Sequence, residues 1–353
     1  MTLFDSPAFE GHEAVHAFHD QASGLRCIIS VHSTARGPSA GGCRMWPYHS
    51  SEAAMVDALR LSRAMSYKNA VADLELGGGK AVIIGDSKTQ KSPALFEAFG
   101  RAVEQVGGRY WAAEDVGISP GDLAHARKFT RYVAGLDGHP AASGDPSPVT
   151  ADGVFRGIGL CVRRAYGSGL SGVTVAIQGV GHVGGFLADN LKAAGARLII
   201  TDVNETALRE VADRTGAEIV RPDAIFDAPA QVFAPCALGG AITLENLARL
   251  KGRVIAGGAN NPLASPEAGQ AVFEKGLTYA PDYVINGGGI INVAAEIRAL
   301  DRDEAYQPAW VQAKLDRLMT TLEEILQRSA DEGRPTHDIA GEIARARIEE
   351  ARR

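Results

Sequence analysis

The feature that most constrains the fold is a glycine-rich turn, GVGHVG at residues 179–184, between an apolar run and a helical pattern. In such a turn Gly179 permits a tight bend, Gly181 lets a ligand approach the backbone, and Gly184 lets the helix pack on the strand. A second apolar run, RLIIT, follows and ends at Asp202. An acidic residue at this spacing, after strand, glycines and helix, is typical of a dinucleotide-binding turn. The sequence therefore predicts a Rossmann-type parallel sheet here.

The same turn predicts which dinucleotide is bound. Unpaired N–H groups at the start of the helix attract a pyrophosphate, and the Asp202 carboxylate accepts hydrogen bonds from both hydroxyls of a ribose. A 2′-phosphate would be repelled, and residues 203–205 (VNE) offer no arginine to neutralise it. We therefore expect NAD rather than NADP. Two alternatives stay open: a turn without a ligand, and Asp202 as a cap of the following helix.

The length of 353 residues predicts two domains. Residues 135–147, rich in Gly, Pro, Ser and Asp, are the best linker candidate. Helices and strands are mixed before this segment, and short apolar strands alternate with helices after residue 173, which indicates a wound parallel sheet. We expect an α/β fold of two domains, with boundaries at 1–140 and 141–330, and a C-terminal helix over 331–353 that packs back near the cleft between them.

Periodicity predicts the main elements of each domain. A strand is expected over 26–32, and another directly after the run Gly77–Gly79. Helices are expected over 52–67, 93–106, 121–128, 150–166, 306–331 and 335–352.

Composition excludes several classes of protein. The net charge of −6, from 36 basic and 42 acidic residues, argues against a nucleic-acid partner, which needs a basic face. No apolar run approaches the ~20 residues that span a bilayer, and the first residues carry no signal-peptide pattern. The four cysteines are far apart and lack metal-ligand spacing. We therefore expect reduced thiols, a cytoplasmic protein, and no metal site.

Two lysines flank the glycine run, Lys68 before it and Lys80 directly after it. Two ammonium groups that face one cleft would depress each other's pKa, and partial burial would add to this effect. A lysine brought toward neutrality can act as a general base, and a charged lysine can bind a carboxylate. The alternatives are a phosphate-binding loop at Lys80 and a helix C-cap at Lys68.

An acidic pair, Glu114 and Asp115, follows a short predicted strand. A carboxylate that transfers protons beside a lysine base is chemically reasonable. Spacing alone does not choose between the two residues.

Eight segments, in order over about residues 25–350, resemble the glutamate/leucine/phenylalanine/valine dehydrogenase family. They are GPSAGGCRMWPY (37–48), YKNAVADLELGGGKAVIIGD (67–86), AAEDVG (112–117), GDPSPVTADGVFRG (144–157), IQGVGHVGG (177–185), VFAPCALGG (232–240), IAGGANNPL (255–263) and YAPDYVINGGGIINVA (279–294). Eight ordered segments are far more specific than the glycine turn alone. RMWPY, AAEDVG, DPSPVT and YAPDYVIN are most similar to the leucine-specific branch.

The resemblance implies a reversible, NAD-dependent oxidative deamination of an L-amino acid, leucine or another branched-chain one, to the 2-oxo acid and ammonia. It implies a homo-oligomer, whose N-terminal domain binds the substrate and forms the oligomer. Lys80 matches the lysine that activates water, and Asp115 its proton-transfer partner. Lys68 matches the lysine that binds the substrate carboxylate, and Asn260 the asparagine that assists it.

The resemblance also implies a substrate pocket and a cofactor site. The backbone of Gly41 and Gly42 lines the substrate site, and the side-chain pocket is formed by Ala40, Met65, Ala113, Ile290 and Val293. The cofactor site is formed by Gly179, Gly181, Val183, Gly184, Asp202, Ser147, Thr150, Cys236 and Ala237. His182, inside the turn, is expected to face solvent.

Two pocket positions depart from the usual leucine-specific pattern. Ala40 stands where Leu is common, which enlarges the pocket, and Ile290 stands where Val or Ala is usual, which narrows it. The side-chain preference therefore stays open, with phenylalanine as the alternative substrate. Glutamate is disfavoured, because glutamate-specific relatives carry a lysine at the position of Ala40.

Functions of other classes have less support. A catalytically inactive NAD-binding regulator is opposed by intact Lys68, Lys80 and Asp115. A nucleic-acid-binding protein or a structural scaffold would need a basic patch or a repeat, and the sequence has neither.

Overall fold

The structure, a computed structural model, describes residues 3–237 and 239–353. The chain divides into two compact units, each of which gathers segments that are distant in sequence. The first unit comprises Met1–Asp145, Ile290–Gln312 and Ile343–Arg353, and the second Pro146–Gly289 and Ala313–Glu342. The units are therefore not the continuous stretches, bounded at residues 140 and 330, that the sequence led us to expect. The assignment of substrate binding, oligomerisation and NAD binding to those stretches stays a prediction.

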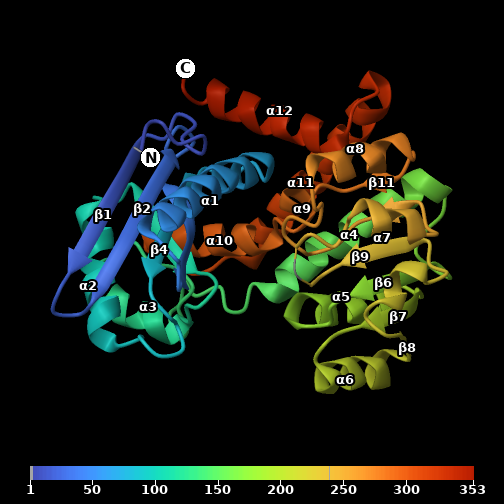
Figure 1. The fold of residues 1–353 in the computed structure, drawn as a ribbon, viewed down its shortest axis with the longest axis horizontal. Helices are drawn as coiled ribbons and strands as arrows, with labels where there is room; N and C mark the ends of the chain where they lie inside the picture. The colour runs from blue at the N-terminus through green and yellow to red at the C-terminus, as the bar shows by residue number, and fades with distance from the viewer. Residues whose placement is uncertain (1–2, 238) are drawn as a thin grey trace. The chain divides into compact units, whose positions relative to one another are not determined.

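The first unit is built on a five-stranded mixed sheet in the order β1-β2-β4-β3-β5, and Figure 1 labels β1, β2 and β4 of this sheet. Its strands are β1 (Ala14–Asp20), β2 (Leu25–Ser33), β3 (Ser39–Trp46), β4 (Gly77–Ile84) and β5 (Tyr110–Glu114). β1, β2 and β4 pair antiparallel, whereas β3 pairs parallel with both β4 and β5. The residues that follow β3 and β5 therefore lie at the same edge of the sheet.

The two faces of this sheet differ in character because side chains alternate along each strand. One face packs its apolar residues, such as Ile29 and Ile83, against α2 (Pro93–Gln105) and α3 (Pro120–Arg127). The other face lies against α1 (Ser51–Val71), where Ala54 and Ala58 contact Val82. By the same alternation Lys80, two residues before Val82, belongs to the face covered by α1.

The glycine run Gly77–Gly79 lies inside strand β4. A Cβ atom added at Gly78 would lie 2.1 Å from the backbone nitrogen of Ser66, so glycine is what allows α1 to cross the strand closely. The alternative of a phosphate-binding loop at Lys80 is therefore wrong. Gly78 of the run serves helix–strand packing.

The second unit is built on a six-stranded sheet, all parallel, in the order β11-β10-β9-β6-β7-β8. Its strands are β6 (Thr174–Gln178), β7 (Arg197–Thr201), β8 (Glu218–Ile219), β9 (Val232–Pro235), β10 (Val254–Ile255) and β11 (Thr278–Tyr279). The chain adds strands outward from β6 in one direction and then outward from β9 in the other. This order is that of the Rossmann fold, whose ligand crevice lies at the carboxyl ends of the two central strands. The expected α/β fold with a Rossmann-type sheet is confirmed.

The remaining elements connect and cover these strands. They are α4 (Ser147–Tyr166), α5 (His182–Ala193), α6 (Glu205–Thr215), a 3₁₀ turn (Ala224–Asp227), α7 (Leu244–Arg249), α8 (Pro266–Glu274), α9 (Asp282–Ile285), α10 (Gly288–Arg302), α11 (Pro308–Glu332) and α12 (Thr336–Glu350). Every helix expected from periodicity is present, with ends shifted by a few residues. α10, α11 and α12 each continue from one unit into the other.

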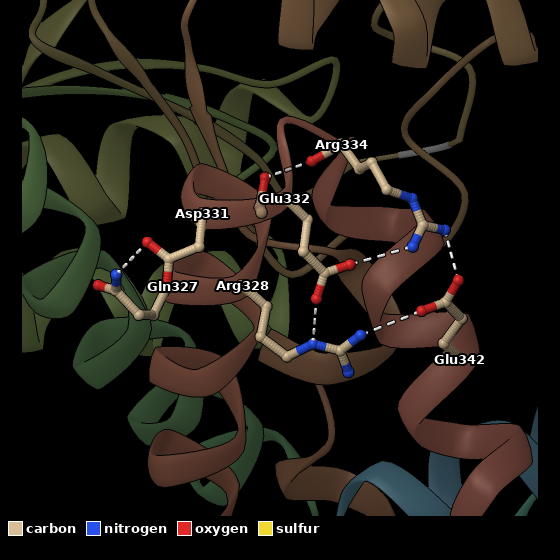
Figure 2. A network of polar contacts seen from close by, with 7 residues as sticks. Gln327, Arg328, Asp331, Glu332, Arg334 and Glu342 are labelled. Atoms are coloured by element: carbon tan, nitrogen blue, oxygen red, sulfur yellow. Dashed lines mark hydrogen bonds and ion pairs between the residues drawn. The ribbon is translucent and has the colours of Figure 1, made fainter.

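A network of charged side chains joins the end of α11 to the start of α12 (Figure 2). The Arg328 guanidinium donates to Glu332 at 2.7 Å and to Glu342 at 3.1 Å. Arg334, in the turn between the helices, pairs with the same two carboxylates. Two arginines shared between two carboxylates hold the turn more firmly than one exposed pair would.

The described residues show no helix long and apolar enough to cross a membrane. All four cysteines are free thiols. Within residues 3–237 and 239–353, no three His, Cys, Asp or Glu side chains gather as they would around a metal ion.

We predict that Gly78→Ala destabilises the protein, because its methyl group would overlap the backbone of Ser66. The expected cost is on the order of 1–3 kcal/mol, the scale of overpacking. Gly169→Ala is the matched control, since nothing lies within 4 Å of a Cβ atom there. Thermal unfolding measures both, and equal melting temperatures for the two variants would contradict the packing argument.

Candidate active site

Three charged side chains meet on the face of the first sheet that α1 covers. Lys80 Nζ donates to Asp115 Oδ2 at 2.5 Å, and Arg44 Nε donates to the same oxygen at 3.1 Å. Lys80 is the most enclosed, with 6% of its side chain exposed, against 25% for each of the other two. An ammonium group this buried and paired to a single carboxylate is unlike a solvated surface lysine.

The contact between Lys80 and Asp115 bridges a whole strand. Lys80 is on β4 and Asp115 follows β5, while β3 lies between them. Strands two places apart are separated by about 10 Å, so the two side chains must pass over β3. Gly42 of β3 leaves that space free, because a Cβ atom there would lie 2.7 Å from Asp115 Cβ and 2.4 Å from the Glu114 carbonyl oxygen.

The structure distinguishes Asp115 from its neighbour. Glu114 pairs in register with Cys43, which belongs to the apolar core on the opposite face. Burial raises the pKa of Glu114, and the nearby carboxylates of Asp145 and Asp137 raise it further. Asp115 is the one that contacts Lys80.

Lys80 and Arg44 favour the charged form of Asp115. Burial is the largest influence and would raise its pKa, but the attraction of Lys80 and Arg44 together outweighs it, so the pKa lies below its ordinary value. Asp115 is therefore an anion at neutral pH, able to accept and return a proton.

Four predicted pocket residues gather beside this pair. A Cβ atom at Gly41 would lie 2.0 Å from the Gly79 carbonyl oxygen and 3.1 Å from Met65 Cγ, so Met65 of α1 lies over Gly41. Ala40 precedes Gly41 on β3 and is fully buried. Ala113 lies opposite Gly42 on β5. The substrate assignments of these residues stay predictions.

Lys68 lies half-buried in the last turn of α1, one turn after Met65. The C-cap of the helix is Ala72, whose N–H donates to the Lys68 carbonyl oxygen. The cap therefore belongs to another residue, and a role for the Lys68 ammonium in binding a carboxylate stays a prediction.

In the second unit the glycine turn has the geometry that a dinucleotide needs. Gly179 has φ +94°, and a Cβ atom there would lie 2.8 Å from the Ala237 nitrogen. A Cβ atom at Gly184 would lie 2.0 Å from the Gly179 carbonyl oxygen. At Gly181, by contrast, nothing lies within 4 Å, and no side chain caps the N–H groups that begin α5. Open space before unpaired N–H groups fits a pyrophosphate.

Asp202 is fixed at the end of β7. Its Oδ2 accepts from the Val180 N–H at 2.7 Å, and its Oδ1 accepts from the Asn204 N–H at 2.8 Å. α6 is capped instead by Asn204, whose side chain accepts from Thr206 and Ala207. The capping alternative for Asp202 is therefore wrong, and its carboxylate is held against the glycine turn.

Three other predicted cofactor residues, Val183, Cys236 and Ala237, lie in or beside the same turn. A Cβ atom at Gly258 would lie 3.0 Å from Val183 Cγ1 and 3.7 Å from Cys236 Sγ. Burial raises the pKa of the Cys236 thiol to about 11, so the thiol is neutral. Ala237 is exposed beside it. Their contact with a cofactor stays a prediction.

Asn260 lies exposed after β10, and its side chain is oriented by Asn286. Asn286 Nδ2 donates to Asn260 Oδ1 at 2.9 Å and to the Gly258 carbonyl oxygen at 3.2 Å. Asn260 Oδ1 is therefore an acceptor of this bond, and the amide nitrogen of Asn260 is a donor, the type of group that a carboxylate ligand needs. The carboxylate itself stays a prediction.

Four further predicted residues lie on two helices. Ser147 and Thr150 are buried in the first turn of α4, and Thr150 Oγ1 donates to the Pro146 carbonyl oxygen at 2.9 Å. Ile290 and Val293 are half-buried on α10. Their places in the nicotinamide site and the side-chain pocket stay predictions. His182 is exposed, as expected.

Sequence reasoning missed two residues of these clusters, Arg44 and Asn286. Arg44 lies in the segment GPSAGGCRMWPY, two residues after Gly42. Since side chains alternate along a strand, that spacing puts Arg44 on the same face as Gly42 and could have indicated it. Asn286 had no comparable signal, because its contact with Asn260 joins segments 26 residues apart.

The chain is similar to known proteins over nearly its whole length. Residues 12–132 match the family model described as Glu/Leu/Phe/Val dehydrogenase, dimerisation domain. Residues 198–353 match the model described as Glutamate/Leucine/Phenylalanine/Valine dehydrogenase. The leucine dehydrogenase of Geobacillus stearothermophilus is 43% identical over 354 residues, which cover 100% of this chain and 95% of that protein.

Two other relatives carry different substrate names. The phenylalanine dehydrogenase of Bacillus thermotolerans is 41% identical over 99% of this chain and 91% of its own length. The crystal structure of L-tryptophan dehydrogenase from Nostoc punctiforme superposes with a TM-score of 0.85 and 37% identity, over 97% of each chain. The relatives are thus named for different amino acids, leucine, phenylalanine and tryptophan, which differ only in their side chains.

Proposed function

The chain belongs to the glutamate/leucine/phenylalanine/valine dehydrogenase family of oxidoreductases, and from this premise we propose that it deaminates a branched-chain L-amino acid, leucine foremost, with NAD as oxidant. The products are the 2-oxo acid, ammonia and NADH, and the reaction is reversible. The observation that carries the proposal is the ion pair of the buried Lys80 with Asp115, which passes over Gly42 on the face that also holds Met65.

Substrate binding uses a cation and an amide. The Lys68 ammonium binds the α-carboxylate as a point charge, and the Asn260 amide donates a hydrogen bond to it. In this proposal the backbone of Gly41 and Gly42 lines the substrate site.

A nicotinamide cofactor held at the turn of residues 179–184 would supply the acceptor for the hydride that leaves the substrate Cα, and the substrate would then be an iminium ion. Lys80, once it is in its neutral form, removes a proton from a water molecule, whose oxygen attacks the iminium carbon. Asp115 accepts and returns protons as the resulting carbinolamine loses ammonia. A carboxylate 2.5 Å from the ammonium is well placed for such transfers.

The chemistry of the pocket favours an apolar side chain. Ala40, Met65, Ala113, Ile290 and Val293 offer no partner for a charge, and an unpaired buried carboxylate costs several kcal/mol. A branched aliphatic side chain gains about 0.8 kcal/mol for each buried methylene. Phenylalanine is the second candidate, because Ala40 leaves room and a phenylalanine dehydrogenase is 41% identical.

NAD rather than NADP is proposed from Asp202. Its carboxylate is fixed by Val180 and Asn204 beside the turn, where it can accept from ribose hydroxyls and would repel a 2′-phosphate. The neighbouring Val203 is 91% exposed and brings no positive charge.

We further propose a homo-oligomer in the cytosol. The matched model for residues 12–132 is described as a dimerisation domain, and four free thiols suit a reducing compartment.

Lys80→Ala is expected to keep the fold and NADH binding and to lower kcat at least ~10²-fold, the scale of a general base. Lys68→Ala should act mainly on KM for leucine, since it removes a carboxylate ligand. Steady-state kinetics with leucine and NAD separate the two effects, with NADH titration as the control for folding. Near wild-type turnover of Lys80→Ala would refute the catalytic assignment.

Asp202→Ser is expected to narrow the preference for NAD over NADP, because the repulsion of a 2′-phosphate is removed. The measurement is kcat/KM for each cofactor at saturating leucine. Asp213→Ser, on the same helix–strand unit but at an exposed position of α6, is the control for the change of charge. Equal use of both cofactors by the unaltered protein would contradict the role of Asp202.

A substrate panel tests the pocket. We expect kcat/KM to rise from alanine through valine to leucine, with differences of about 10–200-fold between neighbouring sizes. The value of kcat/KM should be lower for phenylalanine than for leucine and lowest for glutamate. Ile290→Ala should raise kcat/KM for phenylalanine relative to that for leucine. A preference for glutamate would refute the pocket. A preference for phenylalanine would favour the second candidate and leave Lys68, Lys80 and Asp115 in their roles.

A further inference from the structure

The Lys80–Asp115 pair belongs to a longer row of charges. Arg44 on β3 contacts Asp115 Oδ2 through Nε at 3.1 Å and Asp57 Oδ2 through Nη1 at 3.2 Å. Tyr48, in the loop after β3, donates its hydroxyl to the same Asp57 oxygen at 2.5 Å. The signs alternate from Asp57 to Lys80, and the four charges sum to zero.

Arg44 is a permanent cation in this row. A guanidinium keeps its proton in proteins, whereas a lysine can lose one. Burial opposes the charge of Arg44, but Asp115 and Asp57 outweigh this effect and raise its pKa. When Lys80 gives up its proton, Arg44 therefore still balances Asp115.

The geometry also makes Arg44 act on Lys80. Both cations contact the same oxygen of Asp115, so they lie close to each other. Without Arg44, Asp115 would attract the Lys80 proton alone and hold it more strongly. A second cation competes for that carboxylate and repels the ammonium, which favours the neutral amine.

The other ionisable groups around the row do not replace Arg44. Burial raises the pKa values of Cys43 and Tyr110 well above their ordinary range, so both are neutral. Burial, together with the hydrogen bond to Asp57, also raises the pKa of Tyr48. Glu114 carries no positive charge in any state. Arg44 is thus the cation that the described contacts give Asp115 besides Lys80.

We propose that Arg44, held by Asp57, is a positioning residue of the deamination: it keeps Asp115 charged and in place and lets Lys80 act as a base at a lower pH than Asp115 alone would allow. The inference rests on the proposed function, in which Lys80 is the base that activates water.

The test is the pH profile of kcat for leucine oxidation in Arg44→Met. A general base works only when neutral, and loss of a neighbouring cation stabilises its protonated form. The acidic limb should therefore move to higher pH by about one unit, and kcat below that limb should fall about tenfold, with little change in KM. Arg44→Lys restores a positive charge and should return the limb toward wild type. Arg26→Met, which removes an exposed arginine from β2, should leave the profile unchanged.

A second measurement does not depend on turnover. Only neutral amines react with cyanate. The rate of Lys80 carbamylation is measured by mass spectrometry at a series of pH values, and it reports whether Lys80 carries its proton. In Arg44→Met the rise of the carbamylation rate should move to higher pH, as the acidic limb of kcat does. If Arg44→Met lowered kcat but kept the wild-type pH dependence of both kcat and carbamylation, the proposal would be overturned and Arg44 would be a structural residue. A displaced carbamylation limb in a protein that oxidises no amino acid would refute the proposed function and, with it, the role of Arg44 in deamination, leaving only the effect of Arg44 on the Lys80 proton.

Discussion

The candidate active site depends on one ion pair that crosses a strand. Lys80 and Asp115 reach each other only because β3, which separates their strands, carries glycine where they pass. The parallel pairing of β3 with β4 and β5 sets the register that puts Gly42 between them. A side chain at Gly42 would displace Asp115, the proposed proton acceptor. In the proposed mechanism the pair Gly41 and Gly42 therefore serves the chemistry as well as the packing.

Glycines also shape the turn at residues 179–184 of the second unit. Gly179 and Gly184 pack tightly within the turn, whereas Gly181 borders open space before the N–H groups of α5. Asp202 ties the end of β7 to this turn through the Val180 N–H. The strand order then places the turn at the carboxyl end of β6, beside β9, where ligands of Rossmann sheets bind. Local glycine geometry and sheet topology thus agree on one ligand position.

Much of the turn and its surroundings could be predicted from the sequence, because these features depend on residues that are close together in the chain. The turn at 179–184, its flanking strands and Asp202 need only short-range spacing, and the structure places them as expected. The run Gly77–Gly79 was ambiguous between loop and strand, because the close crossing of α1 that requires it is a tertiary contact. The choice between Glu114 and Asp115 was open for a similar reason: it depends on which face of the sheet holds Lys80. The return of residues 290–312 and 343–353 to the first unit had no signal in periodicity, which describes single helices and not where they pack.

The central claim is that Lys80 and Asp115 act as one catalytic unit, and a double-mutant cycle on kcat tests it most directly. Lys80→Ala, Asp115→Asn and the double variant are compared with wild type, with leucine and NAD at one pH. Residues that act as a unit give strongly non-additive losses, so the double variant should be about as slow as the slower single variant. A loss in the double variant equal to the product of the two single losses would show that the residues act independently and would contradict the account.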